Sequence, residues 1–227
     1  MAVGAAIQGA IGFGANLFAA PLLVLISQDY VPAPVIMAAF VLNLLIMRRD
    51  PGPHHWRLAA WPIAGQLPGA LAGAALLSVV TERDGLGILF GSLTLVAVGL
   101  SLSGLHPRPT KPVLTGAGTI SGFMQTTAGM GGPPIALALQ HAEGPELRGA
   151  LARFFGVACV VSLAMLALFG QVSGHDFAIG AALLPGTFAG FAVSGWLAQR
   201  VDRGRVRTAV LSLSAAAAAL ILVKSLL

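Results

Sequence analysis

Two short stretches of the chain combine glycines with neutral polar side chains, a combination suited to binding a small anion. Glycines let a ligand approach the backbone closely, while amide and hydroxyl groups donate hydrogen bonds without a fixed charge that would retain the anion. The residues concerned are Gly12, Gly14, Asn16, Gln125, Thr126, Thr127, Gly129, Gly131 and Gly132. We expect these nine residues to bind the substrate. Two alternatives stay open: the glycines could instead allow close helix packing, and Asn16 and Gln125 could equally form hydrogen bonds between helices.

The two stretches lie in segments that resemble each other. Residues 7–21 superpose on residues 120–134 with a shift of 113, which aligns Gly9 with Gly122 and Pro21 with Pro134. A second pair of sequences, Pro68-Gly69-x-x-x-Gly73 and Pro185-Gly186-x-x-x-Gly190, follows in the same order. Duplicated apolar segments interrupted by glycine and proline are typical of transporters built from two repeats, with the substrate site near the bilayer midplane. We assign the repeats to residues 1–105 and 113–227.

The composition indicates an integral membrane protein. Hydrophobic residues make up 56% of the 227 residues, charged residues only 9%, and the mean hydropathy is +0.86, whereas soluble domains carry about 25% charged residues. The formal charge of +5 does not indicate nucleic acid, because the Lys and Arg residues cluster between apolar runs. Cys159 is the only cysteine, so no intrachain disulfide can form.

The apolar pattern predicts an all-α protein that forms one membrane domain over residues 1–227. We expect eight segments, at 2–27, 31–47, 58–80, 85–105, 113–140, 149–170, 177–199 and 207–227. Each repeat then consists of a broken or re-entrant helix followed by three transmembrane helices.

The basic residues indicate how the segments cross the membrane. If all eight segments cross once, the loops on the two sides hold six and five basic residues, which contradicts the positive-inside rule. If 113–140 enters and returns on one side, the counts become ten and one, and the single residue is Arg83. If 149–170 or 177–199 is instead the segment that returns to the side it entered from, the loops on the two sides hold nine and two basic residues. The run from Gly129 to Pro134 favours 113–140, because it cannot remain regularly helical. We expect 2–27 to break likewise from the opposite side, which makes the repeats inverted.

Other residues in the segments have more than one interpretation. Close helix packing is the favoured role for Gly69, Gly73, Gly186, Gly190 and Gly195, and helix–helix hydrogen bonding for Asn43 and Gln66. Cys159 is expected to face lipid or fill the core. Arg153 could point into the cavity and bind substrate, or extend to the lipid headgroups. Every Asp and Glu falls in a loop or at a segment end, so we expect movement driven by the membrane potential without a proton or sodium relay.

The two glycine-rich stretches resemble those of the TauE/SafE family of sulfite and organosulfonate exporters. The residues that carry the resemblance are Gly12-Phe13-Gly14, Pro21-Leu22-Leu23 and Gly129-Met130-Gly131-Gly132-Pro133-Pro134. The resemblance implies export of sulfite or a related sulfur-containing anion across the bacterial plasma membrane, with no cofactor. The chain differs from the family where Ala15-Asn16 replaces a further glycine, so Asn16 could tune the choice of substrate.

Several alternatives stay open at this point. The solute could be another small anion, such as an organosulfonate, thiosulfate or a carboxylate, and the protein could be a passive channel or a non-transporting membrane subunit. An enzyme is disfavoured, because no His, Asp or Glu accompanies the Ser, Thr and Cys residues within the segments. We therefore predict no catalytic residues and no metal ligands. The expected partners are the anion and the lipid bilayer, and a homo-oligomer is an open option.

Overall fold

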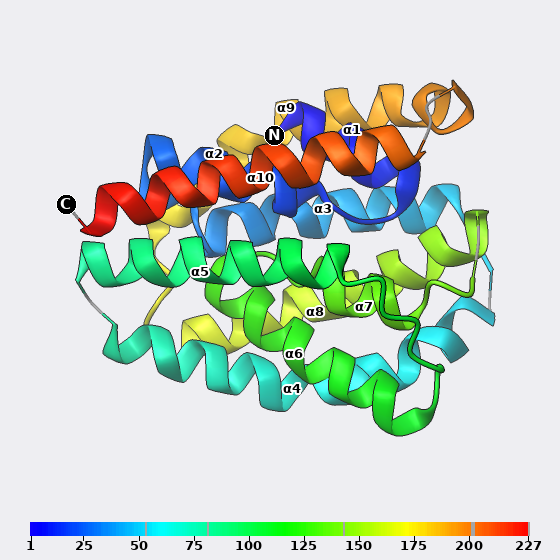
Figure 1. Ribbon diagram of the computed structural model, residues 1–227, viewed down its shortest axis with the longest axis horizontal. Coiled ribbons are helices and arrows are strands. Elements are labelled where there is room, and N and C mark those ends of the chain that lie inside the picture. Colours follow the sequence, from blue (N-terminus) through cyan, green and yellow to red (C-terminus); the bar gives the residue numbers. More distant parts are fainter. Residues whose placement is uncertain (53, 81, 143, 201–202, 227) are drawn as a thin grey trace.

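The structure is a computed structural model that describes residues 1–52, 54–80, 82–142, 144–200 and 203–226. In this part of the chain every regular element is helical (Figure 1). The elements are α1 (Ala2–Ile11), α2 (Ala15–Ile26), the 3-10 turn η1 (Gln28–Tyr30), α3 (Ala33–Arg49), α4 (His54–Val79), α5 (Arg83–Leu102), α6 (Lys111–Ala128), α7 (Gly132–Ala138), α8 (Gly144–Leu168), α9 (Gly174–Arg200) and α10 (Arg203–Leu226). The all-α prediction is confirmed.

In the described part of the chain, six helices are long and apolar enough to span a membrane, namely α3, α4, α5, α8, α9 and α10. They correspond one to one to the six segments that the sequence predicts as unbroken. Several begin three to five residues earlier than predicted, because the helices extend past their apolar stretch into polar residues. For example, α4 begins at His54 and α8 at Gly144.

Both segments that were expected to break are divided into two helices. The first is interrupted between Ile11 and Ala15, and the second between Ala128 and Gly132. Gly12, Gly14 and Gly129 have φ of 101°, 103° and 72°, a left-handed conformation that glycine adopts without steric cost. Gly12 and Gly129 therefore end α1 and α6, and Gly14 immediately precedes α2. The prolines that follow Gly132 occupy the first turn of α7, where proline is tolerated.

The chain folds back on itself at each break. Gly4 of α1 lies so close to Ala15 that a Cβ atom there would overlap the Ala15 carbonyl oxygen. In the second segment the Ser121 hydroxyl donates a hydrogen bond to the Gly131 carbonyl oxygen at 2.5 Å, and α7 packs against α6. Each broken segment is therefore a pair of helices held together across a glycine turn.

Glycines allow the broken segments to pack closely against long helices from the other half of the chain. The main contacts pair α4 with α6 and α1 with α9. A side chain at Gly69 would overlap the Thr119 carbonyl oxygen, and one at Gly190 would overlap that of Ala2. The packing role is confirmed for Gly69, Gly73, Gly186 and Gly190. It is wrong for Gly195, where a Cβ atom would meet no described atom within 4 Å, because no other helix covers that face of α9.

The connections between the spanning helices lie toward two opposite ends of the bundle (Figure 1). At one end Arg148 Nε, near the start of α8, lies 2.9 Å from Asp50 Oδ2, just after α3. At the other end Gln28 Nε2 donates to the Arg83 carbonyl oxygen at 2.9 Å. The grouping matches the division of loops inferred from the charges. We call the end that contains Arg49, Asp50, Arg148 and Arg153 the basic end.

Candidate functional site

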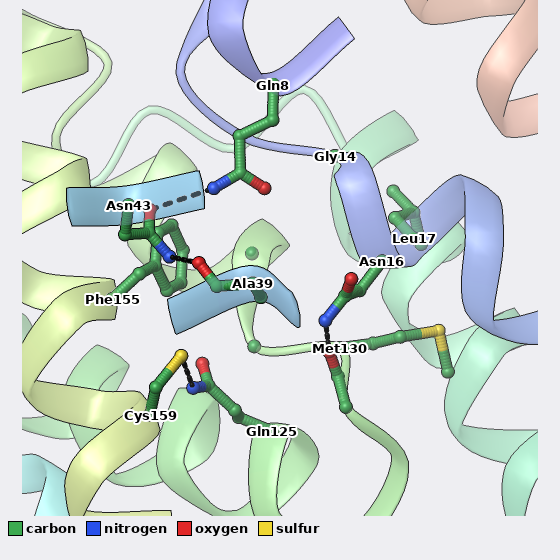
Figure 2. Close-up of a pocket in the computed structure, with 13 residues that line it drawn as sticks. Gln8, Gly14, Asn16, Leu17, Ala39, Asn43, Gln125, Met130, Phe155 and Cys159 are labelled. Atoms are coloured by element: carbon green, nitrogen blue, oxygen red, sulfur yellow. Dashed lines mark hydrogen bonds between the residues drawn. The ribbon is translucent and has the colours of Figure 1, made fainter. Parts of the chain in front are cut away.

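A cavity of about 30 Å³ lies where the two broken segments meet, which is room for about two water molecules. The lining residues come from both broken segments and from the spanning helices α3 and α8 (Figure 2). They are Gln8, Gly14, Asn16, Leu17, Ala39, Asn43, Gln125, Gly129, Met130, Gly131, Gly132, Phe155 and Cys159. None of these thirteen side chains is charged.

Asn16 joins the two breaks directly. Its Nδ2 donates a hydrogen bond to the Gly129 carbonyl oxygen at 2.8 Å, at the residue where α6 ends and the backbone turns left-handed. Asn16 lies in the first turn of α2, just after Gly14. The Asn16 Oδ1 atom is buried and has no hydrogen-bond partner among the described residues. The side chain therefore holds the breaks together and still presents a polar atom to the cavity.

A second set of amides forms the wall opposite Asn16. Gln8 Nε2 donates to Asn43 Oδ1 at 2.9 Å, and Gln8 Oε1 accepts from the Ala15 backbone N–H at 3.3 Å. Asn43 Nδ2 in turn donates to the Ala39 carbonyl oxygen at 2.8 Å. Gln8 thus connects α1, the start of α2 and α3. The helix–helix role expected of Asn43 is confirmed, but its place in the cavity wall was not predicted.

The third wall comes from α6 and α8. Gln125 Nε2 lies 3.4 Å from Cys159 Sγ, with which it forms a weak hydrogen bond. Phe155 lies one helical turn before Cys159 and lines the same cavity (Figure 2). Cys159 is 1% exposed, so it does not face lipid. Nothing in the local sequence around Cys159 signals the cavity, because the rotation of α8 against α6 decides which face turns inward.

The cavity can donate hydrogen bonds to an anion without carrying a charge. An amide nitrogen has two hydrogens, and Gln8, Asn16 and Gln125 each use one in the described part of the chain. The second hydrogen of each group is available to a ligand. Near the start of α2, backbone N–H groups without an intrahelical acceptor add a favourable potential for negative charge. Among the described residues, no group of three His, Cys, Asp or Glu could hold a metal ion.

The structure brings six of the ten sequence-predicted site residues to the cavity. These are Gly14, Asn16, Gln125, Gly129, Gly131 and Gly132.

The other four predicted residues do not line it. Thr126 is buried, and its hydroxyl donates to Ser162 Oγ at 2.8 Å. Thr127 is buried next to Gly73. Gly12 lies against Leu151 and Arg148. Arg153 lies at the basic end.

The family model described as Sulfite exporter TauE/SafE matches residues 1–221 of the chain. The chain belongs to this family. The match includes both breaks, all the cavity-lining residues and most of the last helix. Among curated proteins and solved structures, no significant match was found. Together with the six apolar helices, membership of the TauE/SafE family makes the chain a multi-pass membrane transporter of the anion-exporting type.

Proposed function

We propose that this TauE/SafE protein exports sulfite, or a closely related sulfur-containing anion, across the bacterial plasma membrane. The observation that carries the proposal is the uncharged, amide-lined cavity between the two glycine breaks. Amide donors can replace part of the hydration shell of an oxyanion and still release it. Because irregular backbone inside a membrane is tolerated only where it is buried or lines a cavity, the breaks are the expected place for a substrate site.

We further propose that the chain is one membrane domain of two inverted repeats, 1–105 and 113–227. The repeats match α1 to α5, in order, with α6 to α10. Under this match the contact of α4 with α6 corresponds to that of α9 with α1, and the contact of α4 with α8 corresponds to that of α9 with α3. The packing of α2 on α10 likewise corresponds to that of α7 on α5. Asn16 and Gly129, which bond to each other, are 113 residues apart and so hold equivalent positions. Residues related by a two-fold axis can touch only near that axis, which supports a central cavity.

The size of the cavity favours a compact anion. At about 30 Å³, room for about two water molecules, the cavity is closer in size to a compact anion such as sulfite than to an organosulfonate with a carbon chain. The basic end is the cytoplasmic end in this proposal, since basic loops stay inside. The negative interior potential then favours departure of the anion by ~2.3 kcal/mol per charge per 100 mV.

The test is sulfite flux in proteoliposomes at a clamped voltage. The Gln125→Ala variant removes a donor from the cavity, whereas Gln66→Ala removes a buried amide that bonds Ser162 and does not line the cavity. We expect saturable sulfite flux that Gln125→Ala lowers strongly and that Gln66→Ala retains per folded molecule. Flux of another anion in place of sulfite would contradict the substrate. Absence of any anion flux would contradict transport and favour a subunit role.

A further inference from the structure

Three arginines gather around Asp50 at the basic end of the bundle. Arg148 Nε and Nη2 lie 2.9 Å and 3.4 Å from the two carboxylate oxygens of Asp50, and Arg49 Nη2 lies 3.6 Å from one of them. Arg153 Nη1 lies 3.4 Å from the Asp50 backbone carbonyl oxygen and 2.9 Å from that of Gly149. The two-point contact of Arg148 with Asp50 is the geometry with which arginine binds any oxyanion.

The cluster has more positive charge than its carboxylate can balance. Its formal charge is +2, from three guanidinium groups and one carboxylate. Arg153 is only 6% exposed, and its Nε has no hydrogen-bond partner among the described residues. A buried charged donor without an acceptor is costly, so its persistence calls for an explanation. An oxyanion bound in the cluster would supply both the charge and the acceptor.

The cluster lies next to the cavity along three helices. Arg49 follows the cavity residue Asn43 by six positions on α3, which is about 9 Å of helix. Arg153 precedes the cavity residue Phe155 by two positions on α8. Arg49 also donates to the carbonyl oxygen of Gly9, the neighbour of Gln8 in α1, and to Ser194 Oγ on α9 at 2.7 Å. An anion moving from the basic end to the cavity would therefore meet the cluster first.

We propose that this arginine cluster is a capture site for small oxyanions, and that the Asp50 carboxylate occupies the place of the anion until the anion displaces it. Arg148 would bind two oxygens of the oxyanion, and Arg153 Nε would gain the acceptor it lacks. The binding step does not depend on which anion the cavity transports. Only the later passage of the captured anion rests on the proposed function.

The chain contains a reporter for this site. The guanidinium of Arg153 lies over the ring of Trp56, 5.8 Å from its centroid, and the chain has only three tryptophans. In the full chain with Trp61→Phe and Trp196→Phe, reconstituted in nanodiscs, Trp56 fluorescence can be titrated with sulfite and with sulfate. Chloride at matched ionic strength serves as the control anion. We expect a saturable change with both oxyanions and none with chloride.

Variants distinguish capture by displacement from a structural ion pair. Asp50→Asn removes the competing carboxylate, so we expect oxyanion binding to become about ten-fold tighter, a change of about 1.4 kcal/mol. Arg148→Gln should weaken binding by at least the same factor, and Arg108→Gln, an exposed arginine, should leave it unchanged. Weaker or unaltered binding in Asp50→Asn would overturn the displacement. If that variant does not fold, the comparison of Arg148→Gln with Arg108→Gln decides whether the cluster binds the anion.

A cavity variant separates this inference from the proposed function. In Asn16→Ala, on the same Trp56-only background, we expect the Trp56 response to persist even if sulfite flux is lost. A response lost in Asn16→Ala would mean that the anion binds only in the cavity, which would refute the capture site. A Trp56 response in a protein that transports no sulfite would uphold the capture site and contradict only the transport proposal.

Discussion

Replacing Asn16 with alanine tests whether the contact between the two breaks also binds the substrate. The side chain makes one hydrogen bond within the protein, to the Gly129 carbonyl oxygen at 2.8 Å, and has one further N–H in the cavity. The first bond contributes about 1 kcal/mol to stability. A hydrogen bond to a charged ligand contributes about 1.5–3 kcal/mol, which is roughly ten- to more than one-hundred-fold in affinity. We therefore expect a small loss of stability and a large loss of affinity.

Two measurements separate these effects. Chemical or thermal unfolding in detergent gives the change in stability, and the sulfite concentration at half-maximal flux in proteoliposomes gives the change in apparent affinity. Gln66→Ala is the matched control, because Gln66 is fully buried, bonds Ser162 Oγ at 3.3 Å and lies outside the cavity wall. We expect it to lose stability on the same scale while its half-saturating concentration stays unchanged.

The reasoning would be refuted by an Asn16→Ala protein that is less stable yet binds and transports sulfite with unchanged half-saturation. Asn16 would then act only as a brace between the breaks. Asn16→Asp gives an independent check, since it keeps the shape of the side chain but replaces the donor with a negative group. An anion site should lose nearly all flux in this variant, whereas a site for a neutral or cationic solute should not.

Three further predictions follow from packing, cavity size and charge. Gly69→Ala forces a Cβ atom onto the Thr119 carbonyl oxygen and should lower stability by about 1–3 kcal/mol, whereas Gly195→Ala faces open space and should raise it by up to ~1 kcal/mol; equal melting temperatures would contradict this packing. Phe155→Leu widens the cavity, so organosulfonates should inhibit sulfite flux more strongly than in the wild type in a competition assay. Sulfite flux should follow the membrane voltage and ignore a pH gradient at constant substrate protonation; loss of flux when the pH gradient is collapsed would indicate proton coupling.

The positions of the breaks could be predicted from sequence because their causes are local. A left-handed turn needs glycine, and Gly12, Gly14 and Gly129 adopt it. The six continuous spans could be predicted for a similar reason, since the length of an apolar run is a property of the run itself. Even the division of the loops between two ends follows from counting arginines and lysines, and the ion pair of Arg148 with Asp50 is consistent with it.

Which side chains meet across helices could not be predicted in the same way. Cys159 and Phe155 line the cavity only because α8 is rotated so that this face turns toward α6, a choice that depends on all the neighbouring helices together. Arg153 illustrates the same point. The sequence is consistent with either a cavity residue or a lipid-facing one, yet Arg153 is buried at the basic end and bonds backbone carbonyl oxygens. Thr126 and Thr127 share a turn with Gln125 but point away from the cavity.

The separation of charged and uncharged donors has a consequence for turnover. Two unit charges 4 Å apart attract by about 4 kcal/mol at an effective dielectric constant of 20, so an arginine in the cavity wall would slow release of the anion by about a thousand-fold. The cavity-lining side chains are neutral, and the arginines lie nearer the end of the bundle. In the proposed capture site their attraction would raise the local concentration of anions, while Asp50 would compete with any anion that stays. A transporter needs binding that is favourable enough for the substrate to enter and weak enough for it to leave. The proposed division between the neutral donors Asn16 and Gln125 and the arginine cluster would meet both requirements.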